Sequence, residues 1–427
     1  RGTSPPHIFI DEIYAEERVM PPRGGRKYEG NPAGVSFIRN QTSLAKQAKQ
    51  VPPHIFIEIL FGANRRALKF CHGGKPMKKI LLRSVSAMLI LCLLCGFAGC
   101  NATKKTRYSK QYLDYFDTVS VVVGYEENEA EFNAVCDFVE SELARYNKLY
   151  DIYYKYEGVT NVYNINEDGA KAPVTVDADI IKMLKFAKEM YTFTEGMTNI
   201  AMGSVLSIWH EYREDGIYDP ANAKVPPMED LQAAAEHCNI DDIVIDEEKS
   251  TVFLADPKMS IDVGAVAKGY AVERIAQELI AKGVNNYTLN IGGNIRTIGT
   301  KADGKGWVAG IQNPDIFSED KYLLKVAVAD TALVTSGTYQ RYYYVGDVKY
   351  HHIIDPETLM PKNNFDSVSI ITPDSGVADA LSTACFNLSL EAGQALIASL
   401  ENTEAMWVLA DGTEVYSEGF LSYLYKE

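Results

Sequence analysis

Residues 260–294 read SIDVGAVAKGYAVERIAQELIAKGVNNYTLNIGGN, and this stretch decides the fold class. Apolar residues recur at helical spacing over 266–280, and Gly283 stands where a helix C-cap belongs. Residues 287–291 form a short run typical of a β-strand, and the glycines at 292–293 end it. The stretch therefore predicts a strand, a glycine turn, a helix and a second strand in succession.

Two charged side chains belong to this unit. Asp262 follows the first predicted strand, and Lys268 lies between Ala267 and Gly269 at the start of the predicted helix. Small neighbours let a ligand approach Lys268 closely, while glycine turns and a helix N-terminus present N–H groups to anionic oxygens. The unit favours a phosphate-bearing ligand; the alternative is a solvated charge pair that flanks a turn.

Residues 77–100 (MKKILLRSVSAMLILCLLCGFAGC) have the pattern of a lipoprotein signal peptide, with a basic start, an apolar segment and small residues before the cysteine. Processing would leave Cys100 as a lipidated N-terminus at a membrane surface. The alternative is a short transmembrane anchor or a buried helix, although a span needs about 20 apolar residues. For residues 1–76 we expect either a non-native segment translated from upstream DNA or a disordered extension.

Charge excludes one class of partner. The chain has 42 Lys and Arg and 57 Asp and Glu; 15 and 6 of these lie in residues 1–100, which leaves 27 and 51 for the rest, a net charge of −24. Such an acidic chain is not expected to bind nucleic acid, which requires a basic surface. Cys136, Cys238 and Cys385 lack the spacing of a metal site or disulfide framework, so we expect free thiols.

Beyond Cys100 we expect a polar tether at 101–110 and one α+β domain over 111–427, because helix and strand patterns mix without strict βαβ alternation. Helices are expected at 126–150, 179–194, 230–237, 377–388 and 390–400. Further strands are expected at 116–124, 243–245, 251–254, 307–311, 323–328, 332–335, 342–345, 368–371 and 405–409.

Asp379 and Thr383 stand four residues apart in ADALSTACF, hence on one face of a predicted helix. A carboxylate and a hydroxyl so placed are hard oxygen ligands that suit Mg²⁺ better than zinc. The alternative is structural: an Asp that favours the helix dipole and a Thr that bonds back to its own helix. Spacing alone favours the structural interpretation.

Residues 351–356 read HHIIDP. His352, close in sequence to Asp355, is a candidate acid or base near neutrality, although a histidine pair is more often structural. Ser336 and Gly337 in VTSG predict a tight turn that either offers backbone donors or has no further role. Aromatic clusters at 146–163 and 339–344 suit core packing or the two sides of a flat ring ligand.

Taken together, these motifs resemble the ApbE family of FAD:protein FMN transferases over roughly residues 110–427. Five motifs occur in the family's order: D-x-x-(A/S/G)-x-x-K-G-Y at Asp262, Ala265 and Lys268; GGD-I at 292–295, with Asn294 in place of Asp; SG at 336–337; H-I-I-D-P at 352–356; and A-D-A-x-x-T-A at 378–384. Residues 196–209 (GMTNIAMGSVLSIW) are similar to the family's G-A-F-D-x-T-x-G-P-L-x-x-x-W, with Thr198 and Asn199 where Phe and Asp are usual.

The resemblance implies a single mixed domain of the ApbE, T-fold-like type behind the signal peptide. It implies that Asp379 and Thr383 bind Mg²⁺ through their side chains, with the backbone carbonyl of Ala265 as a third ligand. It places FAD contacts at Phe116, Tyr153, Met197, Thr198, Asn199, Asp262, Lys268 and Ile353.

The implied reaction is Mg²⁺-dependent transfer of the FMN moiety of FAD to a Thr or Ser hydroxyl of an acceptor flavoprotein, with release of AMP. His352 or Asp262 would take the hydroxyl proton, and we favour His352. One alternative is an FAD pyrophosphatase that uses water instead and gives FMN and AMP. Another is a non-catalytic, lipid-anchored FAD-binding protein.

The resemblance also suggests partners and a location. The acceptor would be an FMN-binding subunit of an ion-pumping oxidoreductase or a similar extracytoplasmic flavoprotein, and the sequence does not identify it. The signal peptide implies an extracytoplasmic protein held to a bacterial membrane by lipid on Cys100.

Overall fold

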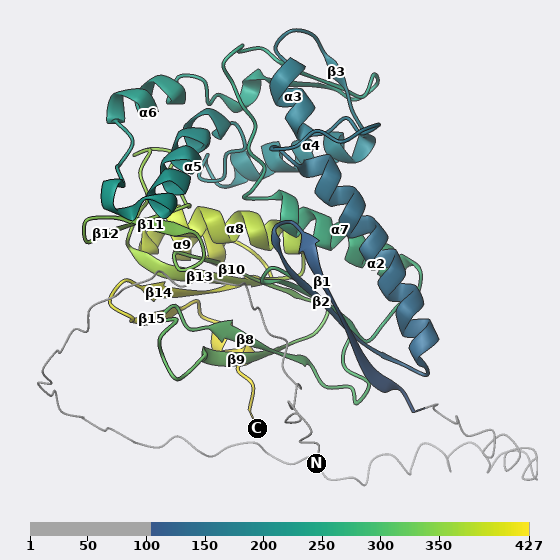
Figure 1. Ribbon diagram of the computed structural model, residues 1–427. Coiled ribbons are helices and arrows are strands. Elements are labelled where there is room, and N and C mark those ends of the chain that lie inside the picture. Colours follow the sequence, from purple (N-terminus) through teal and green to yellow (C-terminus); the bar gives the residue numbers. More distant parts are fainter. Residues whose placement is uncertain (1–103, 427) are drawn as a thin grey trace, which may run out of the picture. The chain divides into compact units, whose positions relative to one another are not determined.

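An eight-stranded antiparallel sheet organises residues 104–426, the part of the chain that the computed structural model describes (Figure 1). Our expectations for residues 1–76, for the signal peptide at 77–100 and for Cys100 lie outside the described residues. The strands run in the order β1 (Thr106–Tyr115), β2 (Thr118–Glu126), β6 (Tyr287–Ile291), β7 (Asn294–Ile298), β10 (Ala332–Gly337), β13 (Phe365–Thr372), β14 (Glu404–Leu409) and β15 (Glu414–Tyr416).

Both faces of this sheet are covered. Successive strand residues point to opposite faces, so Leu333 and Ile371 belong to one apolar cluster while Val334 and Ile370 belong to another. The hairpin of β8 (Trp307–Gln312) and β9 (Tyr322–Val328) packs on the first face. Helices α7 (Ala267–Ala281) and α8 (Ser375–Asn387) cover the second face (Figure 1). Because both faces are covered, the central strands β6 and β7 are buried at every residue.

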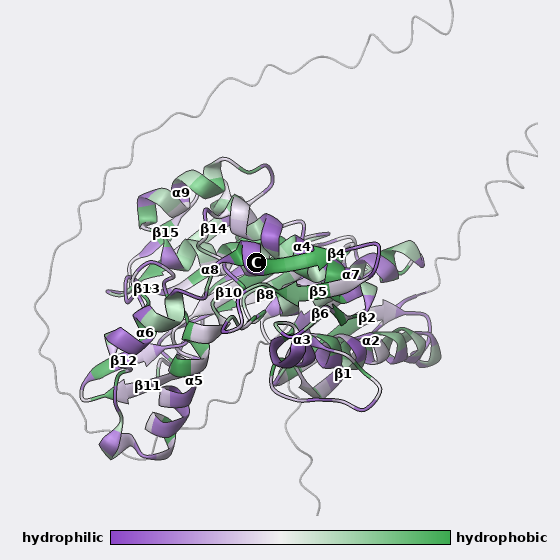
Figure 2. Cartoon of the chain, turned by 90° about the horizontal axis from the view of Figure 1, so that it is seen from above, coloured by the Kyte–Doolittle hydropathy of each residue, from purple (hydrophilic) through white to green (hydrophobic). Residues whose placement is uncertain are grey.

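Helix α2 (Glu129–Tyr150) packs against α7 and the β1–β2 hairpin. Its buried residues recur every three or four positions at Phe132, Cys136, Val139 and Leu143, which is the period of an amphipathic helix. Figure 2 shows hydrophobic and hydrophilic residues interspersed along this helix. Asn128 caps its N-terminus by accepting a hydrogen bond from the Glu131 N–H.

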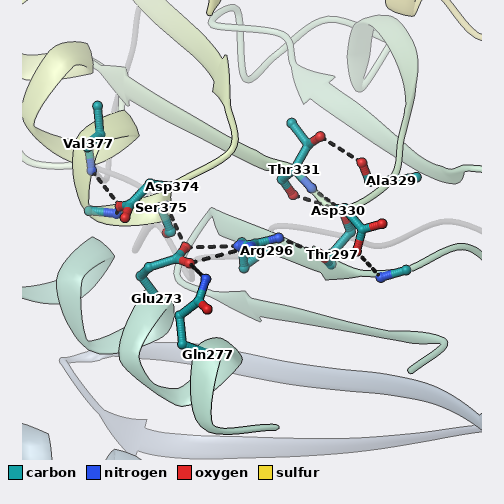
Figure 3. A network of polar contacts seen from close by, with 12 residues as sticks. Glu273, Gln277, Arg296, Thr297, Ala329, Asp330, Thr331, Asp374, Ser375 and Val377 are labelled. Atoms are coloured by element: carbon teal, nitrogen blue, oxygen red, sulfur yellow. Dashed lines mark hydrogen bonds and ion pairs between the residues drawn. The ribbon is translucent and has the colours of Figure 1, made fainter. Parts of the chain in front are cut away.

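A buried ion pair fixes α7 against α8 (Figure 3). Glu273 of α7 accepts hydrogen bonds from Arg296 of β7 (Nε, 2.8 Å) and from the Ser375 N–H in the first turn of α8 (2.8 Å). Arg296 and Glu273 are each 4% exposed, and Gln277 donates a further hydrogen bond to the same carboxylate. One carboxylate therefore ties together a strand and two helices.

The remaining elements flank this core. Helices α3 (Val162–Asp168), α4 (Ala178–Phe193), α5 (Gly203–Tyr218) and α6 (Met228–Ala235) lie between α2 and α7 in the sequence, and α9 (Leu390–Ala398) follows α8. A small sheet contains β3 (Val174–Thr175), β5 (Thr251–Leu254) and β4 (Ile243–Asp246), and β11 (Tyr342–Val345) pairs with β12 (Val348–His351). Among residues 104–426, no helix has the length and apolar character needed to cross a membrane.

The expected α+β class is confirmed, and most expected elements lie within a few residues of the observed ones. Three expectations were wrong. The tether at 101–110 is a strand from Thr106 onward, because the polar run pairs with β2 as an edge strand. The strand that we expected at the start of the 260–294 stretch is only a single bridge, from Ser260 to Met202. Ser336 and Gly337 end strand β10, where they pair with β13, and are not a turn.

Candidate active site

The site is built where the first turn of α7 meets α8. The Gly269 N–H donates a hydrogen bond to Asp379 Oδ2 (2.8 Å). A Cβ at position 269 would lie 2.4 Å from Asp379 Cβ and 2.4 Å from the Ser375 carbonyl oxygen, so only glycine permits this approach. The glycine that follows Lys268 therefore brings the Asp379 carboxylate to the N-terminus of α7.

Asp379 is 6% exposed. Burial raises the pKa of this carboxyl group, and the Lys268 charge and the Gly269 N–H oppose the rise. The buried Nδ2 of Asn294 completes no hydrogen bond, although its amide lies near enough to lower the pKa of Asp379. A buried carboxylate with few donors suits a site that takes a cation.

The metal ligands that the sequence predicts fit this place. Thr383 is one turn further along α8 and partly exposed, and its hydroxyl makes no side-chain hydrogen bond with the other described residues. Because the Gly269 N–H donates to Asp379, it does not donate to the carbonyl of Ala265, and no backbone N–H of residues 104–426 is found on that oxygen. The carboxylate, hydroxyl and carbonyl are all hard oxygen donors of the kind that Mg²⁺ prefers.

No group of three or more His, Cys, Asp or Glu suited to a metal occurs within residues 104–426. The thiols of Cys136, Cys238 and Cys385 are free, as expected.

Lys268 extends from α7 to the β6–β7 turn, where its Nζ donates to the Gly292 carbonyl (3.0 Å). Gly292 and Gly293 have φ of +53° and +86°, and Ile291 pairs with Asn294 across them, so this is the tight glycine turn that the sequence predicts. The alternative to a ligand site was that Lys268 and Asp262 form a solvated charge pair. Within the described residues they form no ion pair, because Lys268 instead contacts the hairpin.

His352 has one occupied ring nitrogen. Its Nδ1 lies 3.2 Å from the Arg341 carbonyl oxygen, which only accepts hydrogen bonds, so Nδ1 carries the proton and Nε2 has a free lone pair. Burial and the positive charge of Arg341 lower the pKa of His352 to about 3. The imidazole is therefore neutral at pH 7, with Nε2 able to accept a proton.

The neighbours of His352 in HHIIDP have structural roles. His351 is 2% exposed, its Nε2 hydrogen-bonds the Lys362 carbonyl, and its Nδ1 accepts from the Ile353 N–H. Asp355 is fully buried, pairs with Lys362 at 2.7 Å and accepts from the Glu357 N–H. Asp355 makes no contact with His352 among the described hydrogen bonds and ion pairs, so it does not orient that ring.

Asp262 and Tyr153 lie near enough for the charge of one to affect the other. Asp262 Oδ1 accepts from the Gly264 N–H (2.8 Å), and burial raises the pKa of this carboxyl group. Burial and then the Asp262 charge raise the pKa of Tyr153 to about 12. The Tyr153 ring is 49% exposed and lies 5.2 Å from the ring of His210.

The other predicted FAD contacts differ in accessibility. Thr198 is 1% exposed, and its hydroxyl donates to the Ala380 carbonyl, while Asn199 bonds to backbone groups of Ala201 and Cys238. Ile353 lies in the apolar core under α8. The side chains of Thr198 and Ile353 therefore support the site from within.

Met197 and Phe116 are partly exposed. Phe116 lies in the β1–β2 turn with φ of +55°, and its N–H donates to Asn147 of α2. A left-handed φ is uncommon for a bulky residue and marks a position that its surroundings hold in place.

Sequence reasoning missed three cationic or ionisable groups around Asp262. They are His210 and Arg213 of α5 and Arg341, which precedes β11. A helical pattern in the segment that follows Trp209, with His210 and Arg213 one turn apart, was the available signal. It also missed the link from β10 to α8, in which Ser336 contacts Ser382 and Ser382 donates to the Asp379 carbonyl.

Comparisons with known proteins agree with the resemblance. The model of the ApbE family matches residues 116–407. A protein of Treponema pallidum named FAD:protein FMN transferase is 31% identical over 338 residues, which cover 76% of this chain and 90% of that protein. A protein of Haemophilus influenzae with the same name is 26% identical and covers 78% and 93%.

Solved structures give the same result. The ApbE protein of Thermotoga maritima is 26% identical, covers 75% of this chain and all of that one, and superposes with a TM-score of 0.66. The flavin transferase ApbE of Vibrio cholerae, at 24% identity and a TM-score of 0.63, shares the fold. From the match over residues 116–407 and these relatives, we conclude that the chain belongs to the ApbE family.

Proposed function

We propose that this chain is a FAD:protein FMN transferase, an enzyme that moves the FMN moiety of FAD to a Thr or Ser hydroxyl of an acceptor flavoprotein. The observation that carries the proposal is the contact between Asp379 and the Gly269 N–H, next to an Ala265 carbonyl that no backbone N–H of residues 104–426 engages. Membership of the ApbE family and the names of the relatives support it.

Asp379, Thr383 and the Ala265 carbonyl would hold Mg²⁺. When bound, the ion supplies positive charge that neutralises the pyrophosphate of FAD. Lys268, fixed by the Gly292 carbonyl, adds a second positive charge near the N-terminus of α7, whose dipole also favours phosphate oxygens. These groups position the pyrophosphate and stabilise charge on it.

The proposed transfer is a substitution at phosphorus. The acceptor hydroxyl oxygen bonds to the phosphorus on the FMN side, the bond from that phosphorus to the bridging oxygen breaks, and AMP leaves with that oxygen. The hydroxyl proton passes to Nε2 of His352, whose Nδ1–H is held by the Arg341 carbonyl. Between the two candidates we favour His352, whose Nδ1–H orients the ring, although Asp262 keeps a second oxygen beside the Oδ1 that the Gly264 N–H engages.

We also propose where the protein acts and which kind of protein accepts the FMN. The signal-peptide pattern at 77–100 supports an extracytoplasmic protein held to a bacterial membrane through lipid on Cys100. The acceptor is then an extracytoplasmic flavoprotein, such as an FMN-binding subunit of an ion-pumping oxidoreductase.

The test incubates the protein with FAD, Mg²⁺ and a candidate acceptor, and measures AMP release together with covalent flavin fluorescence on the acceptor. We expect both signals from the wild type and neither from Asp379→Asn. Asp411→Asn, which removes an exposed carboxylate on another loop, is the matched control and should retain both. AMP with free FMN instead of labelled acceptor would indicate a pyrophosphatase, and flavin binding without AMP would indicate a binding protein.

A further inference from the structure

Two guanidinium groups lie beside Asp262 without a carboxylate partner. Arg213 Nη2 is 2.7 Å from His210 Nδ1, one turn away on α5. The backbone of Arg341 bonds to His352 at both the N–H and Nδ1 of that residue. In the described part of the chain, neither guanidinium has an Asp or Glu oxygen within 4.0 Å. Arg213 is partly buried and Arg341 is exposed.

The two arginines are close enough to affect one another. Burial and the Arg341 charge both lower the pKa of Arg213, and the charges of Tyr153, Glu214 and Asp262 oppose them. Like charges near each other in a partly desolvated place are unfavourable, and Glu214 and Asp262 offset them only from beyond ion-pair distance. In a chain whose residues 101–427 carry a net charge of −24, such a local excess of positive charge is suited to an anionic ligand.

The neighbours indicate the kind of anion. Tyr153 presents a half-exposed ring backed by His210, and aromatic faces stack on flat heterocycles. Asp262 offers a carboxylate oxygen that accepts hydrogen bonds from an exocyclic amino group. A ring, a hydrogen-bond acceptor and two guanidiniums together match a purine nucleotide, because it combines an aminated aromatic base with a phosphate.

We propose that Arg213 and Arg341 bind the adenylate half of FAD through its phosphate oxygens and hold the AMP that leaves. The proposal rests on the function proposed above and assigns two binding residues to it. Guanidinium groups form short, charge-assisted and often bidentate hydrogen bonds with phosphate. When the bridging bond breaks, the AMP phosphate gains the negative charge of the bridging oxygen, so both arginines stabilise the leaving group as well as bound FAD.

The test measures AMP binding by calorimetry to the full chain, without Mg²⁺ or acceptor. Losing one charged hydrogen-bond donor should weaken AMP binding about 10- to 100-fold in Arg213→Gln and in Arg341→Gln. Adenosine, which lacks the phosphate, should bind all variants equally. Arg213→Lys should be intermediate, and Arg107→Gln, which removes a positive charge from the edge strand β1, should bind AMP like the wild type.

Activity measurements separate this inference from the proposed function. In transfer assays the arginine variants should raise the KM for FAD and leave the KM for the acceptor unchanged. Unchanged AMP affinity in both Gln variants, an equal loss for adenosine, or a rise only in the KM for the acceptor would overturn the inference. Because Arg341 is exposed, we expect Arg341→Gln to fold, and its AMP affinity tests the inference even if Arg213→Gln fails to fold. The protein could instead bind AMP through the arginines and yet transfer no FMN. That result would refute the proposed transferase function and leave the inference about the arginines intact.

Discussion

The ion pair between Glu273 and Arg296 allows the sharpest prediction about stability. Both side chains are about 4% exposed, and together they connect α7, β7 and the first turn of α8 (Figure 3). In Glu273→Met the Arg296 charge stays buried with only the Thr297 carbonyl as acceptor, and the Ser375 N–H loses its partner. Removal of one member of a buried pair costs about 3–5 kcal/mol.

Arg296→Met should cost an amount near the lower end of that range, because the remaining Glu273 still accepts from Ser375 and Gln277. The double variant removes both charges and leaves chiefly the Ser375 N–H unsatisfied, which costs about 1–3 kcal/mol. The two changes together should therefore destabilise the protein less than Glu273→Met alone.

Urea unfolding of the four proteins measures the free energy of unfolding and completes the double-mutant cycle. We expect a coupling energy of about 3 kcal/mol or more, well above the experimental error. A double variant whose loss equals the sum of the two single losses would refute the reasoning, because it would mean that the two side chains act independently.

Three further predictions concern the site. Gly269→Ala should lower the melting temperature and raise the Mg²⁺ concentration needed for transfer, since its Cβ meets backbone and Asp379; unchanged Mg²⁺ dependence would contradict this. His352→Ala should slow transfer about 100-fold or more while FAD binding persists, and a fully active variant would exclude His352 as the base. With a folded pKa of about 4, below the usual 6.5, His351 should stabilise the protein fully above pH 6.5 and lose that contribution as pH falls to 4; unfolding of His351→Asn should depend less on pH.

Local patterns were sufficient for much of the fold and for the placement of Asp379 and Thr383 on one helix. The helical spacing of apolar residues predicted α2, α7 and α8. The tight turn with positive φ at 292–293 follows from the two glycines at these positions. The i, i+4 spacing of Asp379 and Thr383 puts both on one side of α8 whatever surrounds the helix. These inferences succeed because each depends on residues within one or two turns of each other.

Only the tertiary structure decided how these pieces act together. The close approach of α7 and α8 diverts the Gly269 N–H to Asp379, and the Ala265 carbonyl has no backbone donor in the part of the chain that the structure describes. The Arg341 carbonyl fixes the tautomer of His352, and Arg213 comes beside Asp262 from a helix about 50 residues earlier in the chain. Spacing within one segment sets which side chains share a face, whereas burial, charge and tautomer depend on neighbours that only chain folding brings into contact.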